Sequence, residues 1–158
     1  MTAKILDGQV LADIVKLQVA EGAASLVVKP GLGTILVGHD PASESYVGAK
    51  IRDCADVGFN SIHAHLDADV DQETLEATIQ QFNDDPAVHA YIVQLPLPKQ
   101  LNEERALLAI DPNKDADGLH PVNLGRLVMG VDGPLPCTPA AIQAMLEHYG
   151  VPVEGGHV

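Results

Sequence analysis

Apolar positions recur at two different spacings along this chain, and the two spacings alternate. Apolar residues repeated every three or four positions predict helices, whereas short apolar runs bounded by glycine or proline predict buried strands. Proline and glycine end several of these segments, because proline cannot continue a helix or a strand ladder. We expect helices over 8–26, 41–58, 71–85, 102–110, 121–130 and 138–150, and strands over 31–38, 59–67 and 90–93.

Three segments allow finer predictions. In the helix over 41–58, the expected inward stripe is Val47, Ile51, Cys54 and Val57 or Gly58. A neighbouring stripe is expected to carry Ser43, Tyr46 and Lys50. The strand over 59–67 alternates, with apolar residues on one face and His63, His65 and Asp67 on the other. The helix over 138–150 begins Thr-Pro, which predicts Thr138 as its N-cap.

The order of these segments predicts the fold class. Alternating strands and helices form right-handed crossovers, so we expect an α/β protein with a mostly parallel open sheet and helices on both faces, in three layers. A chain of 158 residues fits one domain, here 1–150. The last residues, 151–158, have the pattern of a strand just starting, which gains little without a partner. We therefore expect them to begin a further, truncated domain.

Composition narrows the possible partners and location. Twenty-two acidic against nine basic residues give a net charge of -13, which repels nucleic acid and anionic membrane surfaces. No apolar segment approaches the ~18–20 residues that a membrane span needs, and no leader pattern opens the chain, so we expect a cytoplasmic protein. Cys54 and Cys137 are far apart and predict reduced thiols, Cys54 in the core and Cys137 buried or in a loop.

Ligands of open α/β sheets bind outside the carboxyl ends of the strands, here just after Val37 and Val93. Gln94 follows the second of these ends, and the helix after the first carries Tyr46 and Lys50. Residues four apart on a helix share one face, so an aromatic ring and an amine are presented together. The sequence therefore predicts a site formed by Tyr46, Lys50 and Gln94.

Each of these residues also has an ordinary structural interpretation. Most lysines are solvated surface charges, although a partly buried amine can exchange a proton near neutral pH. Gln94 could hold Lys50 by a hydrogen bond, or could equally cap backbone groups at the strand end. Tyr46 could pack with its hydroxyl in water, or could stack on a flat heterocycle.

Metal and nucleophile sites are not expected. His63, His65 and Asp67 share a strand face but have no evident fourth ligand, so a half-exposed strand explains them better than zinc does. The loop over 112–118 has two carboxylates, Asp115 and Asp117, but lacks the spacing and distal glutamate of a calcium loop. It is most simply a polar turn.

Four ordered blocks of sequence carry a resemblance to a known family. They are D-P-A-S-x-x-Y-V-x-x-K at 40–50, V-Q-L-P-L-P at 93–98, P-x-K-D-x-D-G-x-H-P-x-N-x-G-R-L at 112–127 and P-C-T-P at 136–139. Together they closely resemble the bifunctional methylenetetrahydrofolate dehydrogenase/methenyltetrahydrofolate cyclohydrolase family, and they extend over nearly the whole chain.

The resemblance implies roles for individual residues. Lys50 would be the general acid/base, Tyr46 would stack on the folate, Gln94 would bond to the lysine, and Asp117 would bond to the polar edge of the pterin. All four are thus expected to be catalytic. The expected substrate-binding residues are Ser43, Tyr46, Lys50, Gln94, Leu95, Pro96 and Asp117, and the candidates here for contact with the cofactor are Cys137 and Thr138.

The resemblance also implies reactions and partners. The family oxidises methylenetetrahydrofolate with NADP and hydrolyses the methenyl product to formyltetrahydrofolate, in one-carbon metabolism that serves purine biosynthesis. Its members are expected to be homodimers, without a metal. The family continues into a Rossmann domain that binds NADP, of which 151–158 would be the start. No G-x-G-x-x-G occurs here, so we expect the dehydrogenase activity of this chain to be absent or very weak.

Two alternatives stay open on the sequence. One is a non-catalytic module that binds folate or a partner. The other is an unrelated small α/β protein, such as a phosphoacceptor domain with Asp40 after its first strand. The second alternative leaves the four blocks of motif unexplained.

Overall fold

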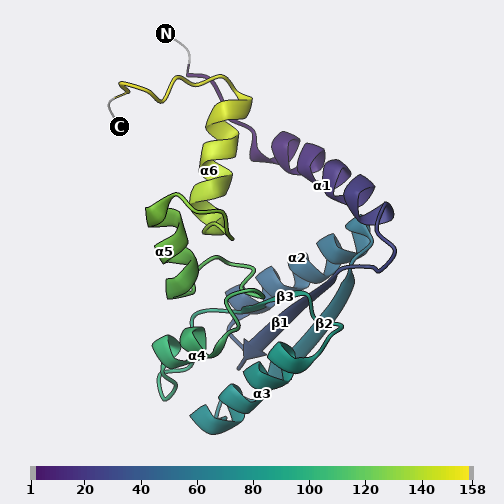
Figure 1. The fold of residues 1–158 in the computed structure, drawn as a ribbon, viewed down its shortest axis with the longest axis vertical. Helices are drawn as coiled ribbons and strands as arrows, with labels where there is room; N and C mark the ends of the chain where they lie inside the picture. Colours follow the sequence, from purple (N-terminus) through teal and green to yellow (C-terminus); the bar gives the residue numbers. More distant parts are fainter. Residues whose placement is uncertain (1–2, 157–158) are drawn as a thin grey trace.

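A computed structural model describes residues 3–156 of the chain. Its sheet has three strands, all parallel, in the order β2-β1-β3. The register places Leu32 of the central strand opposite Ser61 on one side and Ala90 on the other. The predicted parallel α/β sheet is confirmed (Figure 1). The strands are β1 (Gly31–Val37), β2 (Asn60–Leu66) and β3 (Ala90–Val93).

Six helices occur within the described residues, and each lies where the sequence predicts one, to within a few residues. Most begin at a residue whose side chain accepts a hydrogen bond from the first turn, including Asp40, Asp71 and Asn102. None of the helices in residues 3–156 is long and apolar enough to cross a membrane. The helices are α1 (Gly8–Ala24), α2 (Pro41–Val57), α3 (Gln72–Asp84), α4 (Glu103–Ala109), α5 (Pro121–Met129) and α6 (Cys137–His148).

The core lies on both faces of β1. Ile35 and Val37 point into a cluster with the buried side chains of α3, and the inward face of β2 packs against the same cluster. The alternation predicted for β2 is therefore confirmed. The other face of the sheet is covered by α2, which contacts β1 and β2, so α2 and α3 flank the sheet in three layers (Figure 1). The buried residues of α3 are Leu75, Ile79 and Phe82.

The inward stripe of α2 differs from the one predicted. Ile51 is 37% exposed, whereas Ser43 is buried, at 3%. The buried residues Ser43, Val47, Cys54 and Val57 lie four, seven and three positions apart, and one residue completes a 4-3-4-3 spacing. That residue is Lys50, which is partly buried. Lys50 therefore lies in the row that faces the sheet, and Ile51 lies to one side of it.

Two further expectations, about Thr138 and Cys137, are wrong. Helix α6 begins at Cys137, with Pro136 as an N-cap that makes no side-chain bond, because the Ala140 N–H donates to the Pro136 carbonyl and closes the first turn there. Thr138 is therefore inside the helix. Cys137 is exposed on this helix and is neither buried nor in a loop, whereas Cys54 is buried as predicted, and both are free thiols.

Residues 151–156 form no strand, although the sequence there predicts the start of one. A strand needs a neighbour to accept its ladder hydrogen bonds, and Gly155 adopts a left-handed conformation with φ 70° that interrupts an extended run. The last two residues of the predicted strand, 157 and 158, lie outside the described residues.

Candidate active site

The turn after β1 sets the position of α2. Gly38 takes a left-handed conformation, with φ 75°, and its N–H donates to the Leu66 carbonyl at the end of β2. The Asp40 carboxylate then accepts from the Ser43 N–H at 2.8 Å, and this bond to the backbone lowers the pKa of Asp40. Pro41, in the first turn, needs no hydrogen-bond acceptor there. These local bonds fix the direction in which α2 leaves the sheet.

Lys50 and Gln94 meet between α2 and the end of β3. The Lys50 ammonium donates to the Gln94 side-chain oxygen at 3.1 Å. The amide nitrogen of Gln94 donates to the Leu95 carbonyl at 2.7 Å, which fixes the orientation of the amide and keeps its oxygen turned to the amine. The expected hydrogen bond to Lys50 is therefore present, and Gln94 also fulfils the alternative expectation of a bond to the strand-end backbone.

Tyr46 lies one helical turn before Lys50, on the same side of α2. The Lys50 Nζ is 5.7 Å from the centroid of the tyrosine ring, within the range of a cation–π contact. The tyrosine is 64% exposed, so its ring is not part of the core. An open aromatic face beside a positioned amine is suited to a flat, electron-poor ring.

The loop between α4 and α5 brings a carboxylate to the same place. Asp117 is partly buried, and this burial raises the pKa of its carboxyl group, while the charge of nearby Lys50 partly offsets the rise. Its neighbour Asp115 is buried and accepts hydrogen bonds from the His120 N–H and the Asn123 side chain. Asp115 therefore holds the loop in place, and Asp117 presents its carboxylate beside the lysine.

Cys137 reaches the site from the start of α6. Its thiol donates to the Ala116 carbonyl at 3.4 Å, next to Asp117. Although Cys137 is exposed as a whole residue, its sulfur is partly screened from solvent, and this loss of hydration raises the pKa of the thiol. The negative charge of Asp117 raises the pKa of the thiol further. A thiol that keeps its proton is a poor nucleophile. That Cys137 is not a catalytic nucleophile stays a prediction.

The other predicted site residues lie at varied depths. Ser43 is buried against the sheet, Leu95 is partly buried, and Pro96 is exposed after a cis peptide bond. Thr138 is exposed on α6. Tyr46, Lys50, Gln94, Asp117 and Cys137 are thus brought together, whereas no contact links Pro96 or Thr138 to Lys50 among the hydrogen bonds of the described residues.

Sequence reasoning missed two features of this region. The residue pattern alone treated Asp115 and Asp117 alike, and only the family resemblance singled out Asp117. Neither singled out His120 and Asn123, although Asn123 is fully buried. The spacing D-x-D shows only that two carboxylates share a turn. Which one faces the core depends on the path of the loop past β3, where Tyr91 forms a bridge to Asp115.

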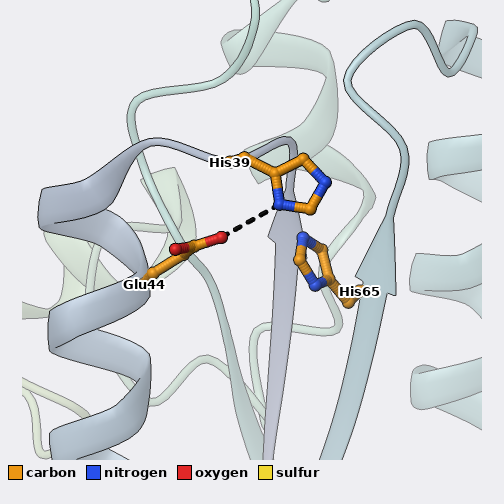
Figure 2. A group of neighbouring side chains, drawn as sticks. All are labelled: His39, Glu44 and His65. Atoms are coloured by element: carbon orange, nitrogen blue, oxygen red, sulfur yellow. Dashed lines mark hydrogen bonds and ion pairs between the residues drawn. The ribbon is translucent and has the colours of Figure 1, made fainter.

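A second polar group lies at the other edge of the sheet. The alternation of β2 places His65 on one face with His63 and Asp67. In the structure, His65 also faces His39 and Glu44 across the end of β1 (Figure 2). The His39 Nδ1 and a Glu44 carboxylate oxygen are 2.9 Å apart. None of these residues contacts Lys50 in the hydrogen bonds described above.

An apolar groove lies between α1 and α6, away from the strand ends. Its volume is about 430 Å³, and Lys16 is its only charged lining residue. Without further polar groups to orient a substrate, the groove offers little for catalysis. The convergence of charged and polar groups at Lys50 makes the strand ends the better candidate for chemistry. The other lining residues are Gly8, Leu11, Ala12, Val15, Ala140, Ala141, Ala144 and Met145.

Comparison with protein families gives a match over most of the chain. Residues 6–117 match the family described as tetrahydrofolate dehydrogenase/cyclohydrolase, catalytic domain. This range includes Tyr46, Lys50, Gln94 and Asp117.

Comparison with solved structures agrees with the family match. The bifunctional methylenetetrahydrofolate dehydrogenase/cyclohydrolase of Campylobacter jejuni is 38% identical with a TM-score of 0.90, over 94% of this chain and 54% of that one. The 5,10-methylenetetrahydrofolate dehydrogenase of the silkworm, Bombyx mori, is 38% identical with a TM-score of 0.91, over 95% and 53%. The Trypanosoma brucei methylenetetrahydrofolate dehydrogenase-cyclohydrolase, complexed with NADP and an inhibitor, is 36% identical with a TM-score of 0.90, over 96% and 54%. The chain spans about half the length of these structures.

Proposed function

The chain belongs to the tetrahydrofolate dehydrogenase/cyclohydrolase family, and from this premise we propose that it binds a folate and hydrolyses methenyltetrahydrofolate to formyltetrahydrofolate. The observation that carries the proposal is the Lys50 amine, held by Gln94 at 3.1 Å beside an open tyrosine ring and a partly buried carboxylate. Membership of this family overturns the alternative of an unrelated phosphoacceptor protein.

The proposed binding mode follows from the three groups around Lys50. The pterin ring stacks on Tyr46, whose face is open. The donor groups on the polar edge of the pterin lose their bonds to water when the ligand binds. They bond instead to the Asp117 carboxylate, and without it they would stay unpaired. Burial disfavours the charged form of Asp117, so a ligand that supplies hydrogen bonds to its carboxylate relieves that cost. Ser43, Leu95 and Pro96 complete the proposed substrate site.

The proposed reaction uses Lys50 as a general acid and base. The methenyl carbon lies between two nitrogens and shares their positive charge, so it accepts the oxygen of a water molecule. The neutral amine form of Lys50 takes a proton from that water as the carbon–oxygen bond forms. The ammonium so formed gives its proton to the leaving ring nitrogen as the carbon–nitrogen bond breaks, and the hydroxyl proton is released as the formyl C=O forms, so that hydrolysis of the cation yields the formyl product and one proton. Gln94 keeps the amine directed at the reacting carbon. The product is formyltetrahydrofolate.

The residues described here do not fit a dinucleotide. A pyrophosphate site of the Rossmann type needs a glycine-rich turn from a strand into an open helix N-terminus. Each of the three connections from a strand to a helix in residues 3–156 ends instead in a side-chain cap, from Asp40, Asp71 or Asn102. We derive no step through NADP, and we propose that this chain has little or no dehydrogenase activity. Near-normal NADP reduction by the purified chain would contradict this.

Replacement of the lysine tests the proposed hydrolysis. Lys50→Met keeps the length of the side chain but removes the amine, so we expect hydrolysis of methenyltetrahydrofolate to slow by about 10²–10⁴-fold, the usual contribution of a general acid/base. Folate binding, measured by calorimetry, should persist because the ring and Asp117 remain. Lys29→Met, at an exposed lysine before β1, is the matched control and should leave the rate unchanged.

The same experiment separates catalysis from binding alone. If parent and Lys50→Met turn over equally slowly while both bind folate, the chain is a non-catalytic folate-binding module. If neither protein binds folate, the proposal as a whole is wrong.

The remaining family properties are proposals of the same kind. We propose that 1–150 is the catalytic domain and that 151–158 begins the next one. We further propose a homodimer in the cytoplasm, without nucleic acid, membrane or metal as a partner in the reaction, that supplies one-carbon units for purine biosynthesis. Light scattering of the purified chain and of its full-length relatives would measure the oligomeric state.

A further inference from the structure

Two histidines and a glutamate converge at the edge of the sheet away from β3. His39 follows β1, Glu44 lies in the first turn of α2, and His65 lies near the end of β2 (Figure 2). One ligand atom from each residue lies within 4.8 Å of the other two, and all three side chains are exposed to solvent. Three separate elements therefore direct metal-binding groups at one place.

Hydrogen bonds already hold two of these rings. The His39 Nδ1 is 2.9 Å from a Glu44 oxygen, and the His65 Nε2 is 2.7 Å from the Gly38 carbonyl oxygen. A carbonyl only accepts, so the His65 Nε2 carries a proton and its Nδ1 has the free lone pair. A histidine that donates one ring N–H to a backbone carbonyl has the arrangement usual for metal ligands. The two rings pack edge to face, with centroids 4.8 Å apart.

The backbone under the three residues is held by independent bonds. The Gly38 N–H donates to the Leu66 carbonyl at 2.9 Å, which ties the turn after β1 to the end of β2. Asp40 caps α2 and so fixes the helical turn that carries Glu44. Only the side chains need to move for the three ligand atoms to close on one ion. A site on a fixed backbone loses little entropy when it binds.

The chemistry of the three groups selects a class of metal. Two imidazoles and one carboxylate are the protein ligands of many open zinc sites, with a fourth position left for water. With metal–ligand bonds of about 2.0–2.2 Å, tetrahedral ligand atoms lie roughly 3.3 Å apart. The separations here, from 2.9 Å to at most 4.8 Å, lie on both sides of that value. Magnesium and calcium prefer all-oxygen sites and fit poorly.

We propose that His39, Glu44 and His65 form a surface site for a divalent transition metal ion, with Zn²⁺ as the reference ion. The ion replaces the proton between His39 and Glu44 and takes a ring nitrogen of His65 as its third ligand. The net charge of -13 adds a general attraction for cations. The proposed metal site is separate from the proposed folate chemistry, because none of its three ligands shares a hydrogen bond with Lys50 within residues 3–156.

Titration of the whole chain, without a tag, with ZnCl₂ tests this proposal. Calorimetry should show one tight site per chain. His39→Ala and His65→Ala should each lower the affinity for Zn²⁺ by at least about tenfold. This is the smallest loss of metal affinity that usually follows when a residue that only supports a ligand is removed. Glu44→Gln, which keeps the size of the side chain, should weaken binding as well. Titration with Co²⁺ should give the visible absorption of a tetrahedral site.

His63→Ala is the matched control. His63 is also exposed on β2, two residues from His65, with ring centroids 6.1 Å apart, but it is not one of the three converging ligands. This variant should bind Zn²⁺ as the parent does. The proposal is overturned if the parent binds no Zn²⁺ in a saturable way, or if His63→Ala weakens binding as much as His65→Ala. It is also overturned if His39→Ala and Glu44→Gln leave binding unchanged. Circular dichroism of each variant checks the fold, and Glu44→Gln serves if a histidine variant does not fold.

Discussion

Asp115 and Asp117 lie two residues apart in one loop and have opposite surroundings. Asp115 is 3% exposed, and one of its oxygens accepts from the His120 N–H and the Asn123 amide, both at 2.9 Å. Asp117 is only partly buried, and the positive charge of Lys50 acts on its carboxylate. The protein supplies hydrogen-bond donors to Asp115, and this carboxylate therefore stabilises the loop. It supplies fewer donors to Asp117, and that carboxylate is therefore available to a ligand.

The surroundings of Asp115 form a closed network. The Asn123 amide also donates to the Pro112 carbonyl at 2.8 Å, and its oxygen accepts from Arg126 at 3.0 Å. Within the described residues, no buried side-chain nitrogen or oxygen lacks a hydrogen-bond partner. The buried donors and acceptors of the network are thus paired within the protein, and its contribution to function is to hold Asp117 beside Lys50.

Asp115→Ala should cause the largest loss of stability among the variants that compare the two carboxylates. It removes the acceptor of the His120 N–H and one of the two acceptors of the Asn123 amide, which keeps its bond to the Pro112 carbonyl. Because bonds to a charged group are among the stronger ones, we expect a loss of about 3 kcal/mol in the free energy of unfolding. Urea denaturation measures it. Asp115→Asn keeps one acceptor oxygen and should lose less. If Asp115→Ala is as stable as the parent, Asp115 is not the structural carboxylate.

Asp117→Ala should show the reverse pattern. Asp117 makes few bonds within the protein, so its removal should change the free energy of unfolding by less than about 1 kcal/mol, as expected away from buried networks. Folate affinity should fall by about 10–100-fold, because the polar edge of the pterin loses its acceptor. Calorimetric titration of the parent and both alanine variants compares the two carboxylates. An unchanged folate Kd in Asp117→Ala would remove Asp117 from the site.

A carboxylate remote from the site provides a scale for these effects. Asp71 caps α3, accepting from the Thr74 N–H at 2.8 Å, and this bond lowers the pKa of Asp71. Asp71→Ala should lower the stability by the modest amount that is usual for the loss of an exposed N-cap. It should leave folate binding unaltered. If Asp71→Ala loses as much stability as Asp115→Ala, the buried bonds of Asp115 contribute no more to stability than the bond of an exposed helix cap.

The smallest expected effect is a difference in pH dependence. Burial raises the pKa of Asp117 above its ordinary value of 3.8 in the folded chain. Between those two pKa values the folded state binds more protons than the unfolded one, so ionisation of Asp117 costs stability as the pH rises. Asp117→Asn should therefore gain stability relative to the parent on going from pH 3.5 to pH 7. Asp71→Asn should lose stability relative to the parent over the same range, because the pKa of Asp71 is lowered.

Much of the fold could be predicted from the sequence because its signals are local. Glycine and proline mark the ends of β1 and β3, and the spacing of apolar residues identifies α3. The start of α6 was misplaced because Thr-Pro is a good cap in isolation, whereas here Pro136 accepts the first helical bond. The strand expected over 151–156 failed because a strand depends on a partner that sequence spacing does not supply.

The candidate site was predictable in part. The carboxyl ends of parallel strands lie at one edge, so the meeting of Lys50 and Gln94 follows from topology. Other features depend on the path of loops. Sequence spacing does not reveal that Asp115 points inward and Asp117 towards Lys50. It also does not reveal that His65 faces His39 and Glu44. Such contacts join residues whose separation along the chain carries no periodic signal.

A crystal structure of this chain with bound folate would test the central claim most directly. The account requires the pterin on the face of Tyr46, its polar edge at the Asp117 carboxylate, and the one-carbon position within hydrogen-bond reach of the Lys50 amine. Folate bound in the apolar groove between α1 and α6, with Lys50 and Asp117 left in solvent, would contradict it.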